Sequence, residues 1–307
     1  MAVLRTQQSS SPRRAVSPAE RQEWLLFLLL VVPNLLLFTI FTYWPLLYNG
    51  YLSFVRWDFL GPKIWVGFDN YRYLFTSSTF GTILWNTVLF TAASVALLLG
   101  LGLAIAMLLN QPLRGRNSVR AIVFSPVMLS GAAIGIVWMY IFDPRYGLLD
   151  FFFRALGTKS PNWLLEPAWA MAAVIIVHVW KNIGYAVVIY LAGLQAIPRQ
   201  LYEAALVDGA NAYARFRYVT LPGLSPVLFF LMVTTVLAGF QSFDIIHVMT
   251  EGGPVHATTT LIFYMYEEGF NATNVGRAAV AAVVLFAAML LFTLVQMRYN
   301  ERNVNYQ

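Results

Sequence analysis

The sequence contains no cysteine, which excludes disulfide bonds, thiolate nucleophiles and metal sites built on cysteine. Charged residues are also scarce. They make up 11% of the 307 residues, whereas soluble domains carry about one quarter. Apolar residues reach 59% and gather in long uncharged runs. This composition predicts an all-α integral membrane protein rather than a pair of soluble domains.

Groups that carry enzymatic chemistry are missing as well. His178 and His256 have no metal-ligand spacing, and no HExxH sequence or carboxylate cluster occurs. No GxxxxGKS/T phosphate loop occurs, and Gly252-Gly253-Pro254 is typical of a turn. We therefore expect no catalytic residue, no metal site, no cofactor in this chain and no ATP hydrolysis by it. The net charge of +6 comes from dispersed basic residues, so nucleic acid is not an expected partner.

Six apolar runs are long enough to cross a hydrocarbon core of about 30 Å as helices. The predicted spans are at about 24–44, 83–110, 121–142, 168–194, 224–249 and 278–297. Residues 1–23 and 298–307 are polar and are predicted to be tails. The connections 48–77 and 143–167 are rich in Trp, Phe, Gly and Pro, which favours interfacial helices and turns.

The distribution of Lys and Arg predicts the orientation of these spans. With the amino terminus inside, twelve of the twenty basic residues fall on the cytoplasmic side and six on the outer side. Cytoplasmic segments of membrane proteins carry the excess of positive charge. Both termini are therefore expected in the cytoplasm, together with the connection 198–222.

The connection 198–222 is too short and too charged to cross a bilayer. Proline is tolerated in a first helical turn, and Glu203 would lie near the positive end of the helix dipole. Ala204, Ala205 and Gly209 would line one side of this helix, with Ala205 and Gly209 one turn apart. Such a face suits close docking into a groove of another protein. A plain amphipathic connector is the alternative.

The same connection resembles the EAA loop of ABC importer permeases. The resemblance rests on Glu203-Ala204-Ala205, on Gly209, and on Val219-Thr220-Leu221-Pro222, with Val219 where the family usually has isoleucine. It implies a type I importer permease fold and a coupling helix seated on a separate ATPase subunit. The implied ATPase-coupling residues are Glu203, Ala204, Ala205, Asp208, Gly209, Leu221 and Pro222.

The resemblance extends over about residues 33–307 and points to the carbohydrate (maltose-type) family. Segments similar to that family are 66–71, 143–149, 250–254, 257–262 and 266–270. It implies a bacterial inner-membrane, multi-pass subunit surrounded by lipid, paired with a second homologous permease. It also implies two ATPase subunits that bind ATP and Mg, and an extracytoplasmic substrate-binding protein.

The substrate class also follows from resemblance rather than from residue chemistry. The outer segments and the chain's end are most similar to first permease subunits of sn-glycerol-3-phosphate importers. This implies import of sn-glycerol-3-phosphate or glycerophosphodiesters by alternating access. Neutral sugars or oligosaccharides of the maltose type are the alternative. An ion-coupled secondary transporter would be expected to show repeated broken helices, and no internal repeat is visible.

Lys181 is the basic residue that interrupts the fourth predicted span. A cation at the centre of a bilayer costs about 2.5 to 3.5 kcal/mol on insertion scales, so Lys181 should face a partner or a wet cavity. Trp180, Asn182 and Tyr185 would add aromatic faces and an amide to a substrate pathway. Alternatively, Lys181 pairs with Asp244 or with an acid of the companion subunit.

The fifth predicted span contains Gln241, Asp244 and His247 at spacings of three, so they would share one face of a continuous helix. This polar stripe would either line a passage or hydrogen-bond neighbouring helices. Arg277 opens the sixth span at its outer end. It would either attract an anion or extend its charged end to the interface.

Overall fold

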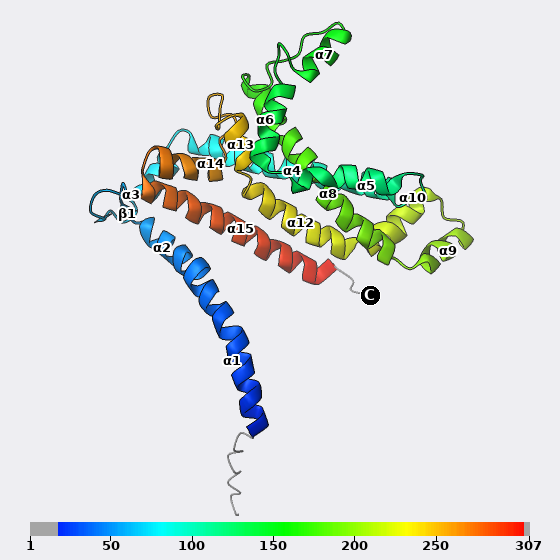
Figure 1. The fold of residues 1–307 in the computed structure, drawn as a ribbon, viewed down its shortest axis with the longest axis horizontal. Helices are drawn as coiled ribbons and strands as arrows, with labels where there is room; N and C mark the ends of the chain where they lie inside the picture. Colours follow the sequence, from blue (N-terminus) through cyan, green and yellow to red (C-terminus); the bar gives the residue numbers. More distant parts are fainter. Residues whose placement is uncertain (1–17, 304–307) are drawn as a thin grey trace, which may run out of the picture. The chain divides into compact units, whose positions relative to one another are not determined.

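The computed structural model describes residues 18–303, and side chains from residue 22 to residue 298. The chain divides into two units, residues 1–51 and 52–307, which are described separately. It is helical almost throughout (Figure 1). Residues 1–17 and 304–307 of the predicted tails lie outside the described residues. The rest of both tails, residues 18–23 and 298–303, is helical.

The first unit is an apolar helix. It comprises α1 (Pro18–Phe38), the π-helical segment η1 (Thr39–Tyr43) and α2 (Trp44–Leu52), which runs into the second unit. The stretch Gln22–Leu52 is long and apolar enough to cross a membrane, and its most apolar window has no buried residue. A helix that is apolar on all sides has to be covered by lipid or by protein.

The second unit supplies the other apolar helices of membrane-crossing length. They are α4 (Phe80–Leu109), α8 (Pro167–Ala196), α12 (Ser225–Phe240) together with α13 (Asp244–Met249), and α15 (Val275–Asn303). A bent pair joins α5 (Arg116–Phe124) and the 3₁₀ turn η2 (Ser125–Met128) to α6 (Gly131–Ile141). The described residues thus provide five candidate spans, or six if the bent pair counts as one.

Two of the predicted spans are interrupted. The span predicted at 121–142 bends by 106° between η2 and α6, where Leu129 and Ser130 have extended backbones. The span predicted at 224–249 leaves its helix at Gln241–Phe243. The prediction that Gln241, Asp244 and His247 share one face of a continuous helix is therefore wrong. The apolar composition runs through both breaks, so length and hydropathy alone do not reveal them.

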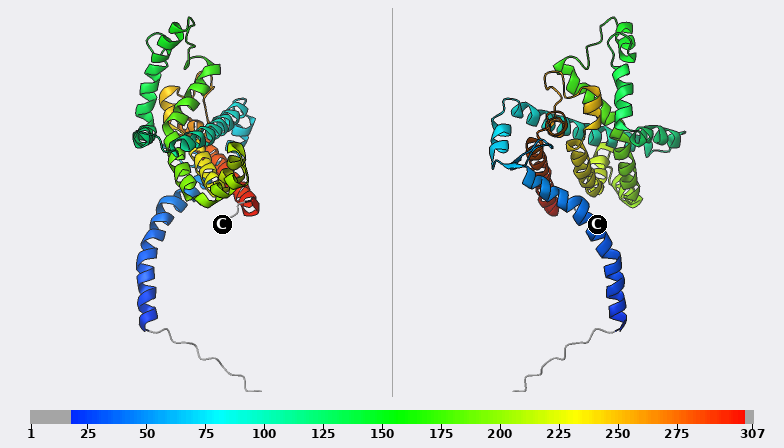
Figure 2. Two further views of the ribbon diagram at one scale, coloured as in Figure 1. Left: turned by 90° about the vertical axis from the view of Figure 1, so that its right-hand side faces the viewer. Right: turned by 60° about the vertical axis from the view of Figure 1, so that its left-hand side comes forward.

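The helix α8 lies at the centre of the second unit, with half of its most apolar window buried. It lies beside α4, as Figures 1 and 2 show. Small residues allow close packing of α8 on α4, where a Cβ at Gly102 would stand 2.9 Å from the Cβ of Ala186. They do the same against α12, where a Cβ at Gly193 would stand 2.6 Å from Val227. Membrane helices associate through such small residues because lipid supplies no hydrophobic force between them.

A separate group of short elements surrounds the start of α15. It contains the antiparallel strands β1 (Val55–Arg56) and β2 (Ile64–Trp65), α3 (Asp69–Thr76), α14 (Leu261–Tyr266) and the π-helical η4 (Glu267–Asn271). Asn70 donates hydrogen bonds to the carbonyls of Ser53 and Val55, at 3.0 and 2.9 Å. The connection 48–77, predicted as interfacial helices and turns, therefore also contains a short strand pair.

The remaining elements are short helices in the connections. They are α7 (Leu148–Ala155), α9 (Arg199–Val207), α10 (Ala212–Arg215), the π-helical η3 (Phe216–Thr220) and α11 (Leu221–Gly223). In Figure 1, α7 lies at the top of the second unit and α9 at its right-hand side.

The contact between α5 and α8 yields a test of the fold. A Cβ at Gly184 would overlap the carbonyl of Val123 and stand 2.7 Å from the Cα of Phe124. Because both obstacles are backbone, we expect Gly184→Ala to lower the free energy of unfolding by about 1 to 3 kcal/mol. Thermal unfolding in detergent measures this.

The control is Gly100→Ala in α4, where no atom lies within 4 Å of a Cβ. Alanine favours a helix over glycine, so this variant should be at least as stable as the parent. Equal midpoints of thermal unfolding for Gly184→Ala and Gly100→Ala would contradict the close approach of α5 and α8.

Candidate coupling loop and polar sites

The predicted helix over 198–222 is several short elements rather than one. The helix α9 ends at Val207, and α10 begins after a turn at Asp208–Asn211. The segments η3 and α11 then lead into α12. The Asn211 side chain caps α10 by accepting a hydrogen bond of 2.8 Å from the Ala214 amide.

Gly209 ends α9 through its backbone. Its φ is +76°, a left-handed conformation that glycine adopts without steric cost. Its amide donates to the Leu206 carbonyl at 3.0 Å, and the Ala210 amide donates to the Ala205 carbonyl at 2.8 Å. This is a Schellman ending. The expectation that Ala205 and Gly209 form one small helical face is therefore wrong, because Gly209 lies beyond the helix.

One side of the loop is anchored to the core of the unit. The hydroxyls of Tyr202 and Thr220 are 3.0 Å apart, and Tyr202 and Val219 pack against the buried cluster shared by α4, α8 and α12. The helix α9 has no buried residue, and Glu203 and Ala204 are exposed. Exposed large apolar side chains of the loop are Leu201, Leu206, Val207, Tyr213 and Tyr218. An anchored loop with exposed large apolar side chains is typical of a docking surface.

The remaining predicted coupling residues flank this surface. Asp208 is exposed and caps the end of α9. Leu221 and Pro222 belong to α11, which continues the helical run of α10 and η3 and ends at Gly223. Leu224, just beyond, is fully buried. The predicted residues therefore occupy one loop, but with different local roles.

The residues of α8 that are predicted to line a substrate pathway are partly exposed. Trp180 is 42% exposed and meets Trp138 of α6 edge to face at 5.4 Å. Asn182 donates to the carbonyl of its own helix at His178, and Tyr185 packs against the core. Within residues 22–298, no carboxylate lies within 4.0 Å of the Lys181 ammonium. The predicted alternative of an ion pair with Asp244 is thus not formed.

His178 joins these residues, although the sequence indicates only that it is not part of a metal site. Its Nδ1 is 3.1 Å from the Ser242 hydroxyl in the break of span five. Its Nε2 is buried and finds no hydrogen-bond partner among the described residues. Lys181 and Asp244 both lie within electrostatic range of its ring. The spacing of the two residues in the sequence could have indicated this association. His178 precedes Lys181 by three residues, so both lie on the same face of α8.

Asp244 and His247 have different surroundings at the start of α13. The Asp244 carboxylate packs on Gly131, where a Cβ would overlap it. It also lies at the amino-terminal end of α6, which favours negative charge. His247 instead stacks on Phe243 at 5.0 Å and meets Tyr266 at 4.9 Å. Gln241 is exposed, and its amide approaches the sulfur of Met289 at 3.8 Å.

Arg277 belongs to a separate cluster. Its guanidinium lies 3.5 Å from the ring centroid of Tyr73 and 3.8 Å from Glu268. Tyr264 donates a hydrogen bond of 3.1 Å to the same carboxylate. Burial and the charge of Glu268 raise the pKa of Tyr264, so its phenol stays protonated and remains a donor. None of the α8 residues borders the adjoining cavity of about 140 Å³. The structure therefore does not bring Arg277 together with Lys181.

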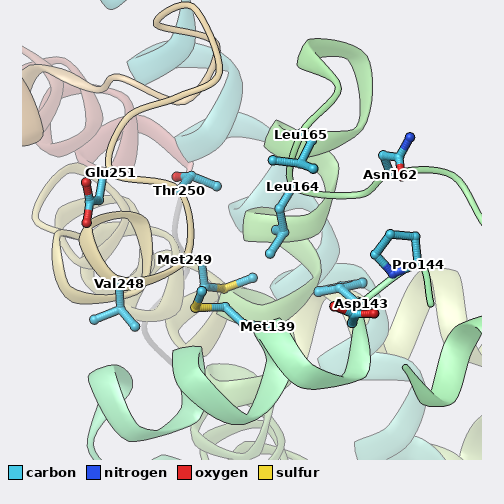
Figure 3. A pocket seen from close by; sticks show the side chains of 11 residues that line it. Met139, Asp143, Pro144, Asn162, Leu164, Leu165, Val248, Met249, Thr250 and Glu251 are labelled. Atoms are coloured by element: carbon cyan, nitrogen blue, oxygen red, sulfur yellow. The ribbon is translucent and has the colours of Figure 1, made fainter. Parts of the chain in front are cut away.

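A larger cavity of about 410 Å³ lies between two loops that the resemblance singled out. Figure 3 shows Asp143 and Pro144 on one side of it and Thr250 and Glu251 on the other. The loop at Glu251 is held by buried threonines: the Thr259 hydroxyl donates to the Gly252 carbonyl at 2.9 Å. The two segments are about one hundred residues apart in sequence, so only the fold reveals that they face each other.

Comparison with known proteins identifies the family. Residues 96–306 match the family described as binding-protein-dependent transport system inner membrane component. The chain belongs to this family. The permease is 36% identical to the sn-glycerol-3-phosphate transport system permease protein UgpA of Rhizobium meliloti (strain 1021), over 91% of this chain and 95% of that one. The Escherichia coli (strain UTI89 / UPEC) protein of the same name is also 36% identical, over 94% and 98%.

A solved structure has the same fold. The permease matches a chain of a bacterial alginate ABC transporter, in complex with an alginate pentasaccharide-bound periplasmic protein, with a TM-score of 0.81. The match covers 92% of this chain and 96% of that chain at 23% identity. The resemblance to ABC importer permeases is thereby confirmed, as are the importer fold and the placement in the inner membrane.

The ending of α9 yields a prediction for the coupling loop of the permease. A side chain in the left-handed conformation costs about 1 to 2 kcal/mol, and asparagine tolerates it better than alanine. We expect Gly209→Ala to loosen the last turn of α9. Hydrogen exchange at the Ala210 amide should then accelerate about tenfold, because that amide closes the turn.

The matched control is Gly209→Asn, which should retain most of the protection. If both variants exchange at the parental rate, the left-handed ending of α9 is wrong.

Proposed function

We propose that this permease is one of two membrane subunits of an importer for sn-glycerol-3-phosphate or glycerophosphodiesters. The observation that carries the proposal is the identity of 36% to permeases named for sn-glycerol-3-phosphate transport, over more than nine tenths of both chains. Those names favour a phosphate-bearing substrate over the neutral oligosaccharides considered as an alternative. The chain itself has no catalytic role in this proposal.

In this proposal both termini and the loop 198–222 face the cytoplasm, as the distribution of basic residues favours. The six spans lie at about 24–44, 83–110, 121–142, 168–194, 224–249 and 278–297, between tails at 1–23 and 298–307. A second, homologous permease completes the pathway. Two ATPase subunits, which bind ATP and Mg, dock on the cytoplasmic side. An extracytoplasmic protein delivers the substrate, and the complex of the alginate transporter with a periplasmic protein supports such a partner.

Coupling would occur through the outer face of α9. Glu203 is exposed there beside Leu201 and Leu206, so a groove of the ATPase could receive apolar side chains and pair a basic group with the carboxylate. The contact of Tyr202 with Thr220 would transmit the movement of α9 to α11 and α12. Rigid-body movement of the spans would then alternate access to the pathway.

The substrate pathway would pass the breaks of spans three and five, where polar groups gather around His178. Lys181 is partly exposed and forms no ion pair among the described residues, so its charge is available for a phosphate. Trp180, Asn182, Tyr185, Gln241, Asp244 and His247 would line or support this region. Arg277 is a weaker candidate, because Tyr73 and Glu268 already hold its guanidinium.

The coupling role predicts the effect of reversing one charge. Glu203→Lys should abolish uptake and substrate-stimulated ATPase activity in proteoliposomes of the assembled importer, since a like charge would face the basic groove. Glu23→Lys makes the same change on an exposed residue near the proposed cytoplasmic end of α1 and should leave both activities intact. Normal transport by Glu203→Lys would remove the coupling role of this residue.

The substrate assignment predicts a loss of apparent affinity at Lys181. A hydrogen bond to a charged group contributes about 1.5 to 3 kcal/mol, so Lys181→Ala should raise the KM for sn-glycerol-3-phosphate about tenfold or more. Lys181→Arg keeps the charge and should recover most of the affinity. Uptake of labelled sn-glycerol-3-phosphate by the parent and by both variants measures KM. Unlabelled maltose, added as a competitor, tests the substrate class.

Competition by maltose would overturn the substrate class. Unchanged KM in Lys181→Ala, with phosphate-specific uptake retained, would instead place recognition in the partner permease or the binding protein.

A further inference from the structure

A groove of about 250 Å³ runs between the neighbouring helices α5 and α8. Its polar lining residues are Arg120 and Gln195. The others are apolar or glycine, namely Val123, Gly184, Val187, Val188, Leu191 and Ala192. Val188 is 42% exposed, and Ala192 and Gln195 are exposed as well. The groove is therefore open along this side of α8 and combines one cation with apolar side chains.

The guanidinium of Arg120 lies at the end of α4. It donates a hydrogen bond of 2.8 Å to the carbonyl of Leu109, the last residue of that helix. A helix end carries about half a negative charge, so this contact compensates the arginine only in part. A guanidinium has five N–H donors. Within the described residues, the Leu109 carbonyl is the acceptor that Arg120 finds, and its buried Nε has no partner.

Acidic residues are absent from the helices around the groove. The sequences of α4, α5 and α8 contain neither Asp nor Glu. Arg116 precedes Arg120 by four residues, so both lie on one side of α5, and Arg114 lies just before this helix. No carboxylate of residues 22–298 lies within 4.0 Å of these three arginines. The positive charge beside the groove is therefore unpaired in this part of the chain.

The connection 198–222, which follows α8, does not balance this charge. It carries two acidic residues, Glu203 and Asp208, against the three basic residues Arg199, Arg215 and Arg217. This end of the second unit is therefore positive as a whole, and the excess is greatest at α5.

We propose that the groove binds an anionic phospholipid, with its phosphate on the Arg120 guanidinium and an acyl chain over Ala192 and Val188 toward the middle of α8. Basic pockets between membrane helices bind anionic headgroups in this way. The occupant is lipid because a bilayer adjoins this inner-membrane protein and an anionic headgroup supplies the charge that the groove lacks. A second copy of this chain would bring further arginines to it instead. The inference depends on neither the proposed substrate nor the side of the membrane that the loop faces.

Cross-linking from inside the groove identifies the occupant. The photoreactive residue p-benzoylphenylalanine replaces Val188 in the assembled importer, in nanodiscs of phosphatidylglycerol and phosphatidylcholine in equal amounts. The matched control position is Leu97 of α4, which is 40% exposed and does not line the groove. Mass spectrometry measures the ratio of the two lipid adducts after illumination. One basic residue favours an anionic lipid about fivefold, so the ratio of phosphatidylglycerol to phosphatidylcholine should be at least about fivefold higher at 188 than at 97.

Substitution of the arginine tests whether its charge selects the lipid. Arg120→Gln retains a donor for the Leu109 carbonyl and removes the charge, so it should lower the ratio at 188 about fivefold. Arg120→Lys keeps the charge and should retain most of the selectivity. The ratio at 97 should stay the same in both variants, which separates a loss at the groove from a general disturbance of the fold.

Three results would overturn the proposal. Equal ratios at 188 and 97 in the parent protein would mean that any lipid fills the groove. Adducts of position 188 with another subunit, or no adduct, would mean that protein or water occupies it. An unchanged ratio in Arg120→Gln would remove the arginine from the site.

Discussion

A backbone that leaves its helix inside a bilayer must be buried in protein or line a water-filled cavity, because lipid offers no partner to its amides and carbonyls. This permease leaves its helices in two spans, at Leu129–Ser130 and at Gln241–Phe243. The two breaks lie against each other, but this chain covers them only in part: Ser242 is buried, whereas Leu129, Ser130 and Gln241 are exposed. The Asp244 carboxylate, just after the second break, packs on Gly131, just after the first. The central helix α8 closes the second break through the contact of His178 with Ser242.

This constraint explains where the polar groups of the spans gather. A buried hydroxyl, imidazole or carboxylate in a membrane needs a partner, and a broken helix supplies free backbone groups and room for water. Lys181 and Asp244 both lie within electrostatic range of His178 beside the second break. A polar region between two helix ends is also one that rigid-body movement of the spans can open or close. The same packing that stabilises the fold thus places the candidate pathway.

The parts of the fold that depend on composition could be predicted from the sequence. Runs without charge indicated the candidate spans. The motif around Glu203 indicated the exposed loop between α8 and α12, whose coupling role stays a prediction. The breaks could not be found, because Pro126 and Gly131 are tolerated at helix ends and within spans alike, and hydropathy runs through them. The surroundings of His178 cannot be predicted from the sequence for a related reason. Its partner Ser242 is sixty-four residues away, and a contact at that separation follows only from the packing of α8 against the break.

The residues that carried the resemblance act mainly on the backbone. Gly209 ends α9 in a left-handed conformation, Gly147 permits a close approach to the Asp143 carbonyl, and Gly252 is left-handed in a turn held by buried threonines. Motifs of this kind fix the shape of loops whichever substrate is transported. Glycine is favoured wherever φ is positive or a Cβ would collide with neighbouring atoms. They therefore identify a permease more firmly than a substrate. Any selectivity of this subunit would come from side chains that such motifs do not include, and the side chains that we propose for it are those of α8 beside the helix breaks.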